Sequence, residues 1–274
     1  HRHEKCDQRT EREAVFEGRH EGGLVQAATL GMLVWFIGKL LGFGHKTLAA
    51  VMLAVMFYNS GNYGLPLSEL AYPGRGAAVQ TFVLLTQNVL TFTLGLAIAG
   101  WAGQGDFVKG ILRTLRMPII PTLVAALIAR YYCDGDKSRL PAIIRVSAEY
   151  LSGALVSFAL ITLGAQLASN PRWPRWKPIS LVLVLRLLFG PIQMAGILWF
   201  FHRYGWEATD LWPWPAEVLI ATAATPTAVN TLLLTMELDG DVDMAADCVF
   251  WSTVLSCVTI AMWLLVVKMW FAPG

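Results

Sequence analysis

The sequence predicts an all-α polytopic membrane protein. Of its 274 residues, 55% are hydrophobic and only 15% are charged, whereas soluble domains carry about a quarter charged residues. Eight apolar stretches follow a polar beginning, each near the roughly 20 residues that a helix needs to cross the hydrocarbon core. Several of the eleven tryptophans lie near the ends of these stretches, where the membrane interface favours aromatic rings. The stretches are 24–42, 47–67, 77–102, 107–131, 150–168, 179–201, 213–236 and 245–267.

The beginning of the chain differs in composition from everything that follows it. Residues 1–23 hold five Lys or Arg and six Asp or Glu with few apolar side chains, so they can neither enter a bilayer nor build a core. We interpret them as a disordered or non-native polar tail. They lack the apolar region of a signal peptide, and we expect the chain to be a fragment or a processed product.

Composition and motifs disfavour several other classes of protein. The net charge of +2 is too small and too scattered for nucleic-acid binding. The four cysteines form no CxxC pair. The acidic run at 237–247 lacks the glycine and the distant glutamate of a calcium loop in the required register, so we interpret it as a solvated acidic loop. No HExxH or GxSxG motif is present. We therefore expect neither an enzyme nor a metal or other cofactor.

Two of the apolar stretches contain helix-breaking residues in their middle. The second includes FYNSGNYGLP at 57–66, and the seventh includes AATPTAVN at 223–230. Proline removes a backbone donor and glycine relaxes a helix, and the freed groups are tolerated only against protein or a water-filled cavity. In carriers, interrupted helices of this kind form the substrate site, and their amino termini attract anions. The alternative is a pair of proline kinks whose asparagines tie neighbouring helices together.

An internal repeat relates these two stretches. Sliding the chain along itself by 168 residues superposes Asn62 on Asn230 and Glu69 on Glu237. A repeat unit of five helices is inverted relative to its neighbour, because five crossings reverse the direction of entry. We therefore divide the chain into 24–102, the last three helices of repeat 1; 103–116, a connecting loop; and 107–274, the five helices of repeat 2.

A resemblance to a known family is carried by residues 59–67, 87–95, Leu163, Gly164, Pro226 and Glu237. With these motifs the sequence resembles the auxin efflux carriers, which include plant PIN-formed proteins and bacterial carriers of malonate or malate. The resemblance implies ten helices in two inverted repeats, a fold similar to bile acid sodium symporters, with the fourth and ninth helices crossing at their breaks. Eight of the ten transmembrane helices are then present, and the first two are lacking. The implied location is the bacterial inner (plasma) membrane, in a multi-pass arrangement. The resemblance covers nearly everything after residue 24.

The breaks and the resemblance together indicate a substrate site at the crossing. The resemblance places the crossing at 58–59 and 226–227. Plant members carry proline where this chain has Tyr58 and glutamine where it has Thr227, so auxin is not the substrate that we expect. The candidate substrate-binding residues are Asn59, Gly61, Asn62, Pro66, Gln87, Asn88, Pro226, Thr227 and Asn230.

The predicted function is secondary transport of small organic anions, such as carboxylates or dicarboxylates, across the lipid bilayer by alternating access. Neutral donors suit a carrier that must release its cargo. The alternative is a truncated, non-transporting membrane relic or interaction protein of the same fold, which could assemble as a homodimer.

Ionisable residues inside the spans are candidates for coupling, because charges within a membrane are costly and are often functional. Arg186 lies deepest, and for it we favour a structural ion pair. A proton-coupling role for Glu217 or Asp247 is the less favoured interpretation.

Overall fold

The computed structural model is built from helices throughout the part of the chain that it describes. It describes residues 22–104, 119–133, 137–151, 173–204 and 211–271, with the single positions 161 and 165. Within these ranges the only strand-like contact is an isolated bridge between Tyr58 and Thr227. The all-α prediction is confirmed for these residues.

Four of the described helices are long and apolar enough to cross a membrane, and each coincides with a predicted stretch. The first begins at Gly22, so the last two residues of the predicted polar tail are helical. These helices support the prediction of a multi-pass membrane protein. They are Gly22–Leu40, Gly76–Gly103, Trp176–Arg203 and Val242–Trp270.

The second and seventh stretches are each split into two short helices, as the sequence predicted. The first pair is α2 (His45–Met56) and α3 (Gly64–Ala71), and the second is α11 (Ala216–Ala223) and α12 (Val229–Glu237). Pro66 lies inside α3 rather than in the break. A proline fits there because the first turn of a helix has no internal acceptor for its missing N–H.

Two of the long helices contain a wider π-helical turn in their middle. One runs through α4 (Gly76–Leu90), η1 (Thr91–Gly95) and α5 (Leu96–Gln104). Turns of this kind occur frequently at functional sites. The second runs through α9 (Trp176–Leu183), η3 (Val184–Phe189) and α10 (Gly190–Arg203), and a further helix, α13 (Val242–Trp270), ends the described chain.

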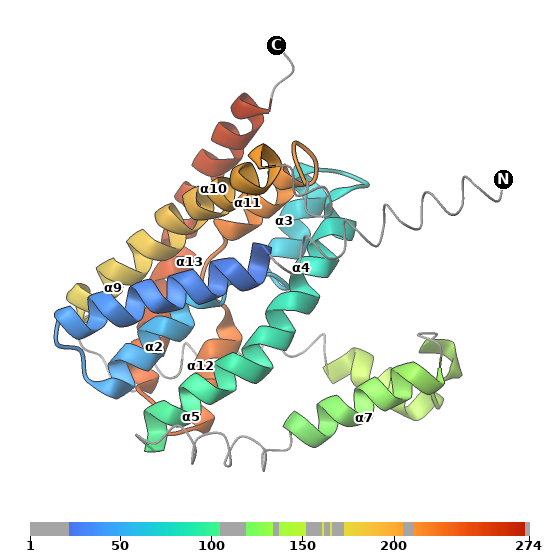
Figure 1. Cartoon of the computed structure of the whole chain (residues 1–274). Helices are drawn as coiled ribbons and strands as arrows, with labels where there is room; N and C mark the ends of the chain where they lie inside the picture. Colours follow the sequence, from blue (N-terminus) through green and yellow to red (C-terminus); the bar gives the residue numbers. More distant parts are fainter. Residues whose placement is uncertain are drawn as a thin grey trace.

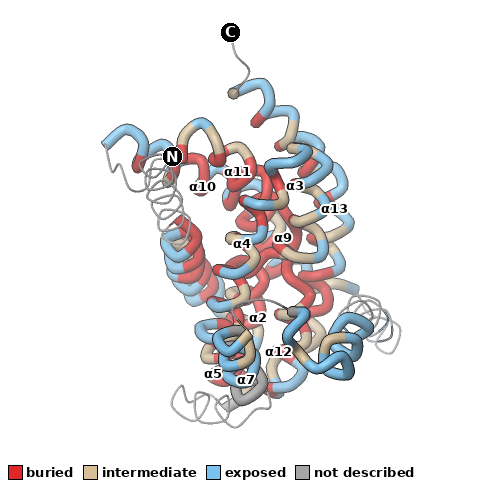
Figure 2. Tube along the Cα trace, turned by 90° about the vertical axis from the view of Figure 1, so that its right-hand side faces the viewer, coloured by how far each residue is buried: buried red, intermediate tan, exposed pale blue. Residues whose placement is uncertain are grey.

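The core lies where these helices meet the two interrupted segments (Figure 1). α2 packs against α5, α9 and α13, and α11 packs against α4, α10 and α13. Figure 2 shows the buried residues concentrated along the middle of the molecule, around α2, α9 and α11. The interrupted helices are thus enclosed by the continuous ones.

The fourth and fifth predicted spans lie largely outside the described residues. α7 (Ile119–Tyr132) covers the end of the stretch 107–131, and helical residues 142–151 overlap the start of the stretch 150–168. α7 lies apart from the main group in Figure 1. The repeat boundaries, the loop 103–116 beyond Gln104 and the count of eight spans therefore stay predictions.

A cluster around Asp241 joins the beginnings of three helices. Arg175 donates to its two carboxylate oxygens at 2.8 and 2.7 Å, and Thr47 donates to one of them at 2.7 Å. The same carboxylate caps α13 by accepting from the Met244 N–H at 3.1 Å. The prediction of a solvated acidic loop is therefore wrong at Asp241, whose side chain is only 15% exposed.

The contacts of Asp241 decide how its charge depends on pH. Burial by itself raises the pKa of this carboxyl, but the hydrogen bonds from Arg175 and Thr47 outweigh it and hold the pKa below its ordinary value. A carboxylate of this kind stabilises the folded state above its unfolded pKa of about 3.9, and the contribution is lost as pH falls through the folded pKa.

We predict that Asp241→Asn lowers the thermal unfolding midpoint of the protein in detergent at pH 7. The expected loss is about 1 to 2 kcal/mol of unfolding free energy, because the substitution weakens charged hydrogen bonds that are partly open to solvent. The difference in midpoint from wild type should begin to narrow as pH falls below about 4, and it should close only below the depressed pKa of the folded protein, where the wild-type carboxyl is itself protonated.

The matched control for this experiment is Glu149→Gln, which removes an exposed ion pair with Arg145 at 3.7 Å. Such pairs contribute little to stability, so its midpoint should stay near that of wild type. Equal shifts in the two variants would contradict the role assigned to Asp241.

Candidate functional site

The two interrupted segments cross and exchange backbone hydrogen bonds. The Asn59 N–H donates to the Pro226 carbonyl at 2.8 Å, and the Ala228 N–H donates to the Phe57 carbonyl at 3.0 Å. These bonds flank the antiparallel bridge between Tyr58 and Thr227. One donor and one acceptor freed by each break are therefore satisfied by the other break, as an apolar surrounding requires.

Side chains fix the crossing from one side. The Thr227 hydroxyl donates to the Ala54 carbonyl at 2.9 Å, and the Thr227 N–H donates to the Ser252 hydroxyl at 3.1 Å. Thr227 is fully buried. The structure therefore gives its hydroxyl a supporting contact within the protein.

Gln80 connects both interrupted segments from α4. Its Nε2 donates to the Ser60 carbonyl at 2.6 Å, and its Oε1 accepts from the Thr222 hydroxyl at 2.7 Å. Gly64 leaves room for this amide, because a Cβ at Gly64 would lie 2.5 Å from Gln80 Nε2. The sequence analysis missed Gln80, although a glutamine within an apolar span and seven residues before Gln87 was an available signal.

Arg186 holds the carboxyl ends of both interrupted helices. Its guanidinium donates through Nη1 to the Val55 carbonyl at 2.8 Å, and through Nη2 to the Ala223 carbonyl. Its Cζ lies 4.7 Å from the centre of the Tyr58 ring. In place of the expected ion pair, Arg186 therefore binds backbone carbonyls, and no carboxylate of the described chain pairs with it.

A polar cavity of about 380 Å³ lies beside the crossing. Six of the nine candidate residues line it together: Asn59, Gly61, Asn62, Gln87, Asn88 and Asn230. The other three, Pro66, Pro226 and Thr227, do not line it. Its remaining walls come from Tyr58, Ser60, Leu84, Thr91, Ala228 and Val229.

The walls of this cavity are polar but carry no carboxylate, amine or guanidinium. The carboxamides of Asn59, Asn62, Asn88 and Asn230 make no hydrogen bond to any other described residue. Each can donate two hydrogen bonds. The site is therefore a group of neutral donors and acceptors.

The amino terminus of α12 also belongs to the cavity wall. Val229 and Asn230 are its first two residues, and their N–H groups have no acceptor within the helix. A helix amino terminus carries roughly half a positive charge, which favours a bound anion. Asn62 and Asn230, which the 168-residue offset superposes, lie in the same wall.

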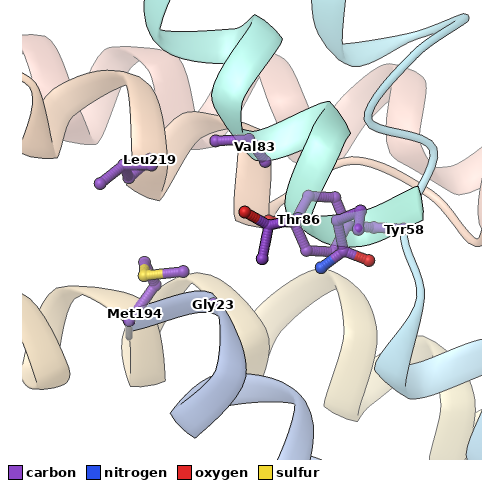
Figure 3. A pocket seen from close by; sticks show the side chains of 8 residues that line it. Gly23, Tyr58, Val83, Thr86, Met194 and Leu219 are labelled. Atoms are coloured by element: carbon purple, nitrogen blue, oxygen red, sulfur yellow. The ribbon is translucent and has the colours of Figure 1, made fainter. Parts of the chain in front are cut away.

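A second, much smaller cavity has a volume of about 10 Å³, and Figure 3 shows side chains that line it. Its walls include Gly23, Thr86 and Met194, so it borders the first helix, α4 and α10. Both cavities share Tyr58 and Gln87. The two cavities therefore adjoin one another at these two residues.

Comparison with known sequences gives a family match over nearly the whole chain. The profile of a family described as membrane transport protein matches residues 24–264. An uncharacterized transporter of Methanothermobacter thermautotrophicus is 31% identical over 244 residues, which cover 88% of this chain and 75% of that protein. An uncharacterized transporter of Methanocaldococcus jannaschii is 25% identical over 239 residues, which cover 85% and 73%.

We predict that cysteines placed at Asn62 and at Thr227 differ in reactivity. In purified protein in detergent, Asn62→Cys should react readily with a charged thiol reagent, because Asn62 is exposed and lines the cavity. Thr227→Cys should react only after unfolding, because Thr227 is fully buried.

The background for this labelling lacks the native cysteines, which are replaced by alanine or serine. Comparable labelling of the two positions in the folded protein would contradict the cavity described above. The residues replaced are Cys6, Cys133, Cys248 and Cys257.

Proposed function

Because this chain belongs to the membrane transport protein family, the auxin efflux carrier family that its motifs indicated, we propose that it carries small organic anions bearing a carboxylate. The family match, the two transporter relatives and the apolar helices show that the protein is a multi-pass membrane transporter. The substrate class and the transport mechanism are our inference from the cavity.

The observation that carries the proposal is the donor set at the crossing. Four carboxamides that make no hydrogen bond to another described residue line one cavity together with the amino terminus of α12. Hydrogen bonds from such groups to a carboxylate are charge-assisted and are stronger than bonds between neutral groups. An anion is therefore favoured over a neutral molecule of the same size.

The cavity wall contains no lysine or arginine. This composition favours a protein that releases its anion over one that binds it tightly. A lysine or arginine in direct contact would hold a desolvated carboxylate strongly and slow its release. Asn59, Asn62 and Asn230 instead offer hydrogen bonds that water can replace when the anion leaves. The volume of about 380 Å³ lies at the small end of ligand pockets, which fits mono- or dicarboxylates of a few carbons.

We further propose alternating access as the mechanism. The crossing, Gln80 and Arg186 join α2, α4, α11 and η3 into one hydrogen-bonded unit. Such a unit is able to move as a body and to expose the cavity first to one side of the membrane and then to the other. The homodimer stays a prediction. The bacterial inner membrane also stays a prediction, since the relatives cited above are archaeal.

We predict a saturable flux of labelled small carboxylates in proteoliposomes that Asn62→Ala and Asn230→Ala each reduce. Removing one charge-assisted hydrogen bond should raise the half-saturating concentration about tenfold or more. Uptake is measured at a series of substrate concentrations for mono- and dicarboxylates, with insertion of each variant checked by protease protection.

The control is Gln193→Ala, which removes an amide on α10 whose Nε2 donates to Thr29, away from the cavity. Its half-saturating concentration should match that of wild type. Absence of flux for every carboxylate with well-folded wild-type protein would refute the proposal and favour the non-transporting alternative. Equal effects of all three variants would show that the cavity is not the binding site.

A further inference from the structure

The position of Arg186 raises a question that anion binding does not answer. Its side chain is fully buried within η3, midway along a helix that is long and apolar enough to cross a membrane. A charge at this depth is costly unless it is compensated. Within the described chain its guanidinium donates hydrogen bonds to the carbonyls of Val55 and Ala223.

Those two carbonyls belong to the carboxyl ends of the interrupted helices. α2 ends at Met56, one residue after Val55, and α11 ends at Ala223. The last carbonyls of a helix lack internal partners and carry roughly half a negative charge. Two such ends together correspond to about one negative charge, which one guanidinium balances.

In carriers with interrupted helices, carboxyl ends and unwound carbonyls of this kind commonly coordinate a coupling cation. Here the guanidinium occupies that place. The fit is close, because a Cβ at Gly190 would lie 3.0 Å from Arg186 Nη2 and 3.4 Å from the Ala223 carbonyl oxygen. A second cation at the same carbonyls would meet the repulsion of the first.

The cavity wall supports the same conclusion. None of its lining residues is acidic, so the cavity itself offers no carboxylate to bind a proton or a metal cation. Across the described part of the chain, no group of three or more His, Cys, Asp or Glu is arranged to hold a metal ion.

We propose that Arg186 is a resident cation that replaces the mobile coupling ion at the crossing, so that transport requires no cation bound there. The inference rests on the proposed function for its consequence in transport, but the occupation of the carbonyl site can be tested without flux. The positive charge of Arg186 offsets the partial negative charges at the carboxyl ends of α2 and α11. The partial positive charge at the amino terminus of α12 then acts on the anion without an opposing charge from those ends.

The test compares wild type with Arg186→Gln, which empties the carbonyl site, and Arg186→Lys, which keeps a cation in it. Arg75→Gln is the control for loss of a charge elsewhere in the chain. Thermal unfolding in detergent is measured in sodium chloride, in dilute guanidinium chloride and in choline chloride at equal ionic strength. For wild type, the unfolding temperature should be the same in all three salts. The same should hold for Arg75→Gln.

Arg186→Gln should unfold at a lower temperature in choline, and sodium or guanidinium should raise that temperature in a saturable way. Arg186→Lys should lie near wild type. Saturable stabilisation of wild type by sodium over choline would overturn the proposal, and so would an Arg186→Gln protein as stable as wild type in choline. If Arg186→Gln fails to fold in every salt, the response of wild type and Arg186→Lys decides.

Flux provides the second arm. Wild-type carboxylate flux should be unchanged when choline replaces sodium on both sides and when the pH gradient is collapsed. Arg186→Gln should lose flux by about tenfold in choline and regain part of it with sodium or guanidinium. Wild-type flux that stops without sodium or without a pH gradient would overturn the inference while leaving anion transport intact, whereas absence of any flux refutes only the proposed function.

Discussion

The structure depends on the exchange of backbone hydrogen bonds between the two interrupted segments. Breaking a helix inside an apolar layer exposes donors and acceptors that cost several kcal/mol each when they are left unpaired, roughly 2 to 7 by model transfer. Asn59 and Pro226 satisfy one another, as do Ala228 and Phe57. Two carbonyls at the carboxyl ends, those of Val55 and Ala223, are bound by Arg186. The breaks can persist only because they meet.

This arrangement separates charge without placing an ion in the cavity. The carboxyl ends of α2 and α11 are neutralised by a guanidinium that sits behind the Tyr58 ring, at 4.7 Å from its centre. The amino terminus of α12 lies in the cavity wall with its first N–H groups uncompensated within the helix. A helix amino terminus favours an anion, and the side chains that line the cavity are neutral, which is the basis of the proposed anion transport.

The sequence predicted the breaks well, because proline and glycine beside asparagine in an apolar stretch have few other structural solutions. The offset of 168 residues also placed Asn62 and Asn230 in correspondence, and both line the cavity. The sequence placed Pro66 in the break, whereas it lies in the first turn of α3, because proline is compatible with the first turn of a helix as well as with a break. Thr227 lies within the break, but the local backbone direction turns its hydroxyl to Ala54. Spacing along the chain does not reveal that direction.

Other contacts had no sequence signal strong enough to predict them. Arg186 binds carbonyls, which every residue possesses, so its partners could not be identified from residue types. Asp241 stood in a run of acidic residues that differed only in position, and its pairing with Arg175 depends on how α9 and α13 begin side by side. Long-range polar contacts of this kind follow from packing, which the apolar pattern specifies only coarsely.

The most direct test of this account is a cryo-electron microscopy structure of the protein in lipid nanodiscs with a saturating small dicarboxylate. The account predicts density for the anion in the cavity, against the N–H groups of Val229 and Asn230 and the carboxamide of Asn62, with the Arg186 guanidinium still bound to Val55 and Ala223. Density for the anion only outside this cavity, or an Arg186 side chain turned away from these carbonyls to contact the anion, would contradict it.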